Sequence, residues 1–197
     1  MSTTEATASQ ETRTLRIFLA RGLIAILWAA VFAVGANSLT FGVGVLLVLY
    51  PLIDAVANLI DARNQRGFPR RLLLGNAAVS TVAAVLLGVA ATSSIADVLA
   101  VFGSWALVSG VAQLATAIRR QPQLGKQWLM RIAGVGSVVL GAVFLIASTG
   151  TDPKLHMLAI YAAGGGTDFV IQAVLLVRRH RRTVKAQHGE RTLAHQN

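Results

Sequence analysis

Residues 50–62 read YPLIDAVANLIDA, in which the polar residues Asp54 and Asn58 interrupt an otherwise apolar segment. Similar segments occur twice more, as WALVSGVAQLATA at residues 105–117 and GGGTDFVIQAVLL at residues 164–176. When the three segments are aligned, their polar residues fall into two columns, formed by Asp54, Ser109 and Asp168 and by Asn58, Gln113 and Gln172. The spacing within each pair is just over one helical turn, so the alignment predicts one polar face on each of three helices.

The composition of the chain is typical of a membrane protein. Of its 197 residues, 54% are hydrophobic and 13% are charged, whereas soluble domains are about 25% charged. The run without charge between Arg21 and Asp54 is too long for one transmembrane helix, which needs roughly 20 residues; Asn37 and Ser38 near its middle predict a tight turn. Transmembrane strands would alternate polar and apolar residues, which these runs do not. The sequence therefore predicts an all-α integral membrane protein with six transmembrane helices, at about residues 17–35, 39–60, 72–91, 95–118, 129–148 and 155–177.

The recurring segments predict an internal repeat. Three helical hairpins, at residues 16–62, 71–118 and 128–178, would form one membrane domain over residues 16–180. Residues 1–15 are expected to form a disordered cytoplasmic tail, and residues 181–197 a basic cytoplasmic tail. An odd number of units does not fit the simple inverted repeat of transporters.

The basic residues predict the orientation. The formal net charge is +10, and all of the 18 Lys and Arg except Lys154 fall on one side of the predicted topology. The positive-inside rule then places both termini and the longer loops in the cytoplasm. The basic segment RRHRRTVK at residues 178–185 is expected to contact anionic lipid headgroups, and nucleic acid is not an expected partner.

Two interpretations of the polar faces remain open. A carboxylate in the middle of the bilayer costs ~2.5–3.5 kcal/mol on insertion scales, so Asp54 and Asp168 should face the bundle interior. If they are dry, they would be protonated and would donate hydrogen bonds between helices to Asn58, Gln113, Gln172 or Ser109. If they are wet, they would line a path for protons or a small solute. Pro51 and Gly164–Gly166 place a helix irregularity beside each carboxyl group, as transporters do, although such residues are also common in ordinary membrane helices.

The sequence contains no phosphate-binding glycine loop, HExxH motif or nucleophile elbow, so no enzymatic activity and no cofactor are predicted. The chain has no Cys, which excludes thiolate metal sites, and no metal site is predicted. His156 is predicted at the outer end of the sixth span, beside Asp152 and Lys154. Because histidine titrates near about pH 6.5, it is a candidate sensor of external pH, but a lone interfacial histidine is more often without such a role.

The repeated hairpins resemble the HdeD-like membrane proteins. The resemblance covers about residues 15–180 and rests on RGLIAIL opening the first unit, on the polar residue within the segments that begin at Tyr50 and Trp105, and on basic residues closing each unit. It implies a bacterial cytoplasmic membrane, six spans and, from the founding member, a role in resistance to acid stress. The chain departs from the family where Ala55 and Phe169 replace the glycine kept as Gly110, which argues against close helix crossings there.

Two functional hypotheses follow from these observations. The first is a non-enzymatic membrane protein of acid or envelope stress resistance, with membrane lipid, a membrane or periplasmic protein and a second copy of the chain as candidate partners. The alternative is a channel or transporter for protons or a small solute, using Asp54 and Asp168.

Overall fold

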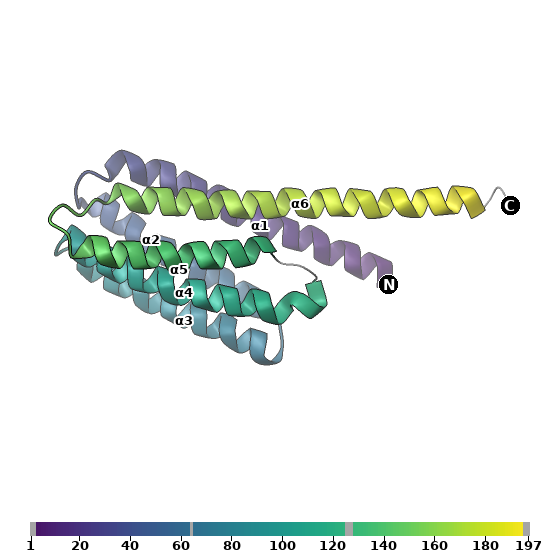
Figure 1. The fold of residues 1–197 in the computed structure, drawn as a ribbon, viewed down its shortest axis with the longest axis horizontal. Coiled ribbons are helices and arrows are strands. Elements are labelled where there is room, and N and C mark those ends of the chain that lie inside the picture. Colours follow the sequence, from purple (N-terminus) through teal and green to yellow (C-terminus); the bar gives the residue numbers. More distant parts are fainter. Residues whose placement is uncertain (1–2, 64, 125–127, 195–197) are drawn as a thin grey trace.

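The computed structural model describes residues 3–63, 65–124 and 128–194, which form α-helices joined by short turns (Figure 1). The all-helical fold predicted from the sequence is therefore confirmed. The helices are α1 (Thr3–Gly35), α2 (Phe41–Ala62), α3 (Gly67–Ala90), α4 (Ile95–Leu124), α5 (Trp128–Ser148) and α6 (His156–Ala194).

Five of the six helices, α2 to α6, contain segments that are long and apolar enough to cross a membrane. The apolar part of α1, Leu19–Gly35, is shorter, and its length is at the lower end of what a bilayer requires. Pro51 lies fully buried inside α2, which remains one helix, and α6 also runs without a break through Gly164–Gly166. The expected helix irregularities therefore do not interrupt either helix.

The two ends of the chain differ from the sequence-based expectation. α1 begins at Thr3, within the segment predicted to be disordered, and α6 continues through the basic tail to Ala194. Neither stretch contains proline inside the helix, so nothing stops the helical hydrogen bonding of the adjoining span from continuing into it. In Figure 1, α6 extends well beyond the end of the bundle.

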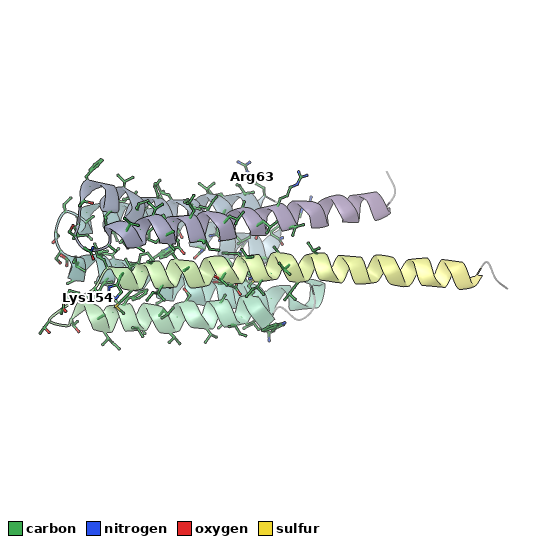
Figure 2. The ribbon with its side chains drawn as sticks, turned by 90° about the horizontal axis from the view of Figure 1, so that it is seen from above. Arg63 and Lys154 are labelled. Atoms are coloured by element: carbon green, nitrogen blue, oxygen red, sulfur yellow. The ribbon has the colours of Figure 1, made fainter. Side chains whose placement is uncertain are left out.

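Short turns close one end of the bundle. Thr40 caps α2 by accepting a hydrogen bond from the backbone N–H of Val43 (3.3 Å). Ser94 caps α4 by accepting one from the N–H of Asp97 (3.1 Å), while the Asp97 carboxylate accepts hydrogen bonds from the hydroxyls of Ser93 and Ser94. These side chains satisfy backbone donors at the helix starts that would otherwise lack partners. Lys154 lies at this end of the bundle and Arg63 toward the other (Figure 2).

The described parts of the six helices form a closed ring in which each helix backbone lies close only to those of its two neighbours. α1 packs most extensively on α6, α2 on α3, and α4 on α5, whereas α1–α2 and α5–α6 contact each other lightly. The predicted hairpins are thus not the most closely packed pairs. The closest pairs join one hairpin to the next, and the α1–α6 pair closes the ring.

Glycines allow two of these pairs to approach at backbone distance. A Cβ added to Gly110 on α4 would lie 2.8 Å from the carbonyl oxygen of Gly134 on α5, and one added to Gly166 on α6 would lie 2.9 Å from the carbonyl oxygen of Gly22 on α1. Only glycine fits such approaches. The close crossing doubted at Phe169 is therefore present in α6, but it uses Gly166.

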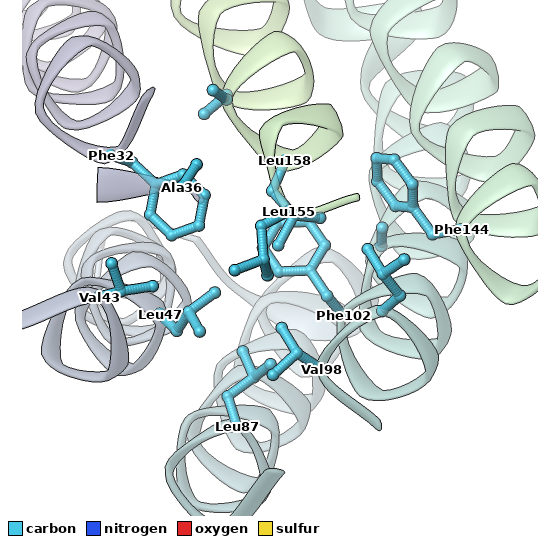
Figure 3. Packing of buried hydrophobic residues seen from close by; sticks show 14 of the residues in the cluster. Phe32, Ala36, Val43, Leu47, Leu87, Val98, Phe102, Phe144, Leu155 and Leu158 are labelled. Carbon is cyan, nitrogen blue, oxygen red and sulfur yellow. The ribbon is translucent and has the colours of Figure 1, made fainter. Parts of the chain in front are cut away.

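The bundle interior is apolar toward the end with the short turns. Fully buried side chains from several helices meet there, including Phe102 of α4 and Phe144 of α5 (Figure 3). The other labelled members of this core are Phe32, Ala36, Val43, Leu47, Leu87, Val98, Leu155 and Leu158. These large side chains fill the space between the helices at the density of a protein interior. The interior of the bundle is therefore closed by packed side chains at this end.

Candidate functional site

Asp54 is the centre of a polar cluster inside the bundle. Its Oδ1 accepts a hydrogen bond from Arg21 Nη2 on α1 at 2.9 Å. Its Oδ2 accepts hydrogen bonds from Asn58 Nδ2 of the same helix (2.8 Å) and from two residues of α3, Asn76 Nδ2 (3.1 Å) and Ser80 Oγ (2.9 Å). Since all four partners donate, the carboxyl group acts only as an acceptor, as an ionised carboxylate does.

Arg21 links this carboxylate to a fourth helix. Its guanidinium carbon lies 4.5 Å from the ring centroid of Phe169 on α6, within the range of a cation–π interaction. Asp54 on one side and Phe169 on the other therefore hold the same cation. Because the guanidinium is always charged, Arg21 places a fixed positive charge against the Asp54 carboxyl group.

Ser80 passes the network on to α4. Its hydroxyl donates to Asp54 and accepts a hydrogen bond from the indole Nε1 of Trp105 (3.0 Å). Both Ser80 and Trp105 are buried, and the hydroxyl and the indole N–H each have the partner that a dry environment requires. Asn76 Oδ1 is buried without a hydrogen-bond partner among the described residues. We call the six connected residues the Asp54 cluster: Arg21, Asp54, Asn58, Asn76, Ser80 and Trp105.

A group of aromatic rings lies between the Asp54 cluster and the end with the short turns. Tyr50 precedes Asp54 by one turn, and its ring lies 5.8 Å from that of Trp105 and 6.3 Å from that of Tyr161. One ring from each of α2, α4 and α6 thus meets on the bundle axis. The aromatic cluster consists of these three rings with those of Trp28, Phe32, Phe102 and Phe144.

Several polar atoms of the aromatic cluster have hydrogen-bond partners within the protein. The indole N–H of Trp28 donates to the carbonyl oxygen of Leu46 at 2.8 Å. The hydroxyl of Tyr161 is 2.7 Å from that of Ser137 on α5, which donates to the carbonyl oxygen of Ala106 on α4 (2.8 Å). These bonds tie α6, α5 and α4 together at the level where the rings meet.

The structure separates the six residues that the sequence places on one polar face. Asp54 and Asn58 lie in the Asp54 cluster. Ser109 is buried on α4 with its hydroxyl unpaired among the described residues, and Gln113 is half-buried one turn further along. Asp168 accepts a hydrogen bond from Gln172 Nε2 of the same helix, α6, and is not part of the Asp54 cluster.

The structure pairs Asp54 with Arg21, a positive charge that the interpretation of a dry, protonated carboxyl group did not consider. Of the four partners proposed for the carboxyl groups, only Asn58 contacts Asp54, and it donates rather than accepts. Asn76 and Ser80 were not anticipated, although they repeat the four-residue spacing of Asp54 and Asn58 on the next span. The sequence does not point to Arg21 or Trp105 as members of this cluster. Arg21 resembles the basic residues that set the membrane orientation, and Trp105 resembles an apolar core residue.

His156, the candidate pH sensor, is exposed at the first residue of α6. The nearby ion pair joins Lys154 Nζ to Asp152 Oδ2 at 2.6 Å, and both side chains are largely exposed. No contact in the described structure joins His156 to this pair, so its sensor role stays a prediction. Among the residues described, no group of three or more His, Cys, Asp or Glu side chains is placed to hold a metal ion.

These features define an all-helical membrane protein with a closed ring of helices and a partly buried ion pair between Arg21 and Asp54. Residues 77–146, which run from within α3 through α4 into α5, match a sequence family described as "Short repeat of unknown function (DUF308)". The chain is therefore similar to that family over its central part. No curated protein and no solved structure matches the chain.

Proposed function

We propose that this chain is a non-enzymatic, multi-pass protein of the bacterial cytoplasmic membrane that contributes to acid or envelope stress resistance as a dry helical bundle. The observation that carries the proposal is the arrangement around Asp54. Its carboxylate receives donors from Arg21, Asn58, Asn76 and Ser80, and the aromatic cluster separates it from the opposite end of the bundle. A carboxylate fully occupied by fixed donors stabilises a fold and has little capacity left to bind and release an ion.

The stress role is supported by similarity. The HdeD-like proteins, which the sequence resembles, belong to the short-repeat family that matches residues 77–146. The founding HdeD-like protein has a role in acid resistance, and the same class of role is proposed here. Both termini are proposed to be cytoplasmic, because all of the Lys and Arg residues except Lys154 fall on that side of the proposed topology.

The proposal includes a threefold hairpin repeat. Its support is that two helix crossings share their contacts: Gly22 meets the Gly166 carbonyl oxygen and the Val170 nitrogen, as Gly134 meets the Gly110 carbonyl oxygen and the Leu114 nitrogen. The shift from α5 back to α1 is twice the shift from α6 back to α4, as three equal repeats require. In this repeat Gly166 is the residue equivalent to Gly110. The alignment of the sequence segments instead places Phe169, three residues later, at the position equivalent to Gly110.

The test is survival at low pH in a bacterial strain that lacks this gene and carries it back on a plasmid. The native gene should restore survival. The doubly neutral variant Arg21→Gln/Asp54→Asn should restore it as well, because it removes both charges together and leaves no unpaired ion in the interior. No gain in survival from the native gene would contradict the proposed role.

A transport function would give a different result. Proton or solute flux through purified protein in proteoliposomes, lost in the Asp54→Asn/Asp168→Asn variant, would favour the channel or transporter hypothesis. Such flux would also explain loss of survival in the Arg21→Gln/Asp54→Asn variant, provided that the variant folds and reaches the membrane in native amounts. Absence of flux from well-folded protein agrees with the dry bundle.

A further inference from the structure

Asp168 lies at nearly the same depth in the bundle as Asp54 but has far fewer partners. Asp168 follows the first residue of α6, His156, by twelve residues, and Asp54 follows the first residue of α2, Phe41, by thirteen. At about 1.5 Å per residue, both lie about 18–20 Å from the end with the short turns. Asp54 receives hydrogen bonds from four donors, whereas Asp168 receives one among the described residues, from Gln172 of its own helix. A carboxyl group at this depth is costly unless it has partners, so Asp168 retains unused capacity to accept hydrogen bonds.

Asp168 borders an exposed face of α6. The residues of this face are spaced alternately by four and by three, so they follow one line along the helix. Its three large side chains are 66%, 44% and 43% exposed, and its two small residues are exposed as well. We call these five residues the α6 face: Ile160, Gly164, Thr167, Ile171 and Val174. The crossing with α1 uses other residues, Gly166 and Val170, so the bundle leaves the α6 face uncovered.

The α6 face combines the two features that bring helices together in lipid. Apolar side chains alone give little attraction there, because lipid tails are equally apolar, whereas small residues and polar side chains do drive association. No heavy atom lies within 4 Å of the position that a Cβ on Gly164 would take, and Asp168 follows one helical turn later. A helix that crosses α6 at Gly164 therefore approaches closely beside a carboxyl group that still accepts hydrogen bonds.

We propose that the α6 face binds the α6 face of a second copy of this chain. Copies with the same orientation in one membrane place Asp168 and Gln172 at one depth, and a symmetric pair brings each residue of one copy to its counterpart region in the other. The Gln172 amide has two N–H groups, of which one donates to Asp168 in its own helix. The other donates to the Asp168 carboxyl group of the second copy. This self-complementary pair favours a second copy over a different protein, which would need a matching donor at the same depth, and the interface does not rest on the stress function.

Energy transfer between labelled copies provides the test. The chain has no native cysteine, so Thr151→Cys in the exposed turn after α5 accepts one fluorophore per copy. Donor-labelled and acceptor-labelled full-length protein is mixed in phosphatidylcholine vesicles at a range of protein-to-lipid ratios. Transfer should follow the binding curve of a dimer and should fall when excess unlabelled native protein is added.

Two pairs of variants locate the interface. Gly164→Leu fills open space without meeting its own chain and should weaken association about tenfold by keeping the two helices apart. Gly75→Leu on α3 is the matched control, since Gly75 is also exposed with open space around it, and should leave association unchanged. Asp168→Leu removes both symmetric hydrogen bonds and should weaken association about tenfold, whereas Asp168→Asn still accepts them and should keep most of it. Circular dichroism checks that each variant keeps its helix content.

Three results would overturn the proposal. One is transfer no greater than random proximity gives at the same protein density. Another is equal weakening by Gly164→Leu and Gly75→Leu, which would place the contact elsewhere. The third comes from native membranes, where oxidation of Thr167→Cys should give a disulfide-linked dimer; a link to a different protein alone would mean that the α6 face has another occupant. If Gly164→Leu does not fold, the comparison of Asp168→Leu with Asp168→Asn still decides the outcome.

Discussion

Arg21 on α1 and Asp54 on α2 form an ion pair, with 2.9 Å between Nη2 and Oδ1, across two helices that otherwise contact each other lightly. Their side chains are 23% and 20% exposed, so most of the surface of both charged side chains is covered by the protein. The backbones of α1 and α2 approach each other at few points, and the ion pair with its cation–π contact to Phe169 connects α1, α2 and α6. We infer that the Asp54 cluster fixes how the ring closes, in addition to stabilising it.

Removing one charge of the pair should be worse than removing both. Asp54→Asn leaves Arg21 without a carboxylate and should lower the free energy of unfolding by about 3 kcal/mol, the size found when a buried pair loses one partner. Arg21→Gln/Asp54→Asn should lower it by less, because no uncompensated ion remains. Unfolding in mixed micelles at increasing denaturing detergent measures both values. A double variant less stable than Asp54→Asn would show that the charges contribute independently.

The glycine crossings should tolerate no added methyl group. Gly110→Ala places a Cβ 2.8 Å from a backbone oxygen of α5, so the helices must separate, and the free energy of unfolding should fall by about 1–3 kcal/mol. Gly136→Ala is the matched control, since its Cβ meets no atom within 4 Å. Alanine has the higher helix propensity, so this control should gain up to about 1 kcal/mol. Equal losses in the two variants would exclude close crossing as the cause.

The sequence predicts where the helices lie along the chain better than it predicts which helices pack against each other. Runs without charge and the turn near Asn37 and Ser38 locate the spans, because the bilayer allows few alternatives. The same runs say little about which helices touch, since lipid and protein interior are equally apolar. The α1–α6 and α4–α5 crossings depend on Gly22, Gly110, Gly134 and Gly166, whose register becomes clear only from the packed structure.

The candidate site was predictable only in part, because the sequence identifies its polar residues but not their partners on other helices. Asp54 and Asn58 stand out because polar residues are costly in lipid, which makes an interior position predictable. Their partners are set by the rotation of α1 and α3, which the spacing along one helix does not determine. Arg21, which the sequence analysis assigned to the cytoplasmic charges that set the orientation, therefore lies in the cluster. Ser109 and Asp168, which align with Asp54 in the predicted repeat, lie outside it.

The hydroxyl of Ser80 should contribute more than that of its neighbour Thr81. Ser80→Ala removes a donor to Asp54 and the acceptor of Trp105 Nε1 together, and should lower the free energy of unfolding by about 1–2 kcal/mol, near the upper limit for interhelical hydrogen bonds in membranes. Among the described residues, the Thr81 hydroxyl hydrogen-bonds only to the carbonyl oxygen of Ala77 in its own helix, and Thr81 is exposed, so Thr81→Ala should be nearly neutral. Detergent unfolding of both variants measures the difference. Equal effects would argue against an interhelical role for Ser80.

Water should not reach the bundle interior at Ser109. The chain has no native cysteine, so Ser109→Cys introduces a single thiol at a buried site with little change in shape. In intact membranes this thiol should react with small membrane-impermeant reagents from neither side, because packed side chains leave no aqueous route to it. Thr151→Cys, in the exposed turn after α5, should be labelled from one side and Arg66→Cys, exposed before α3, from the other. Labelling of Ser109→Cys in folded protein would show a hydrated interior and would favour transport over the dry bundle.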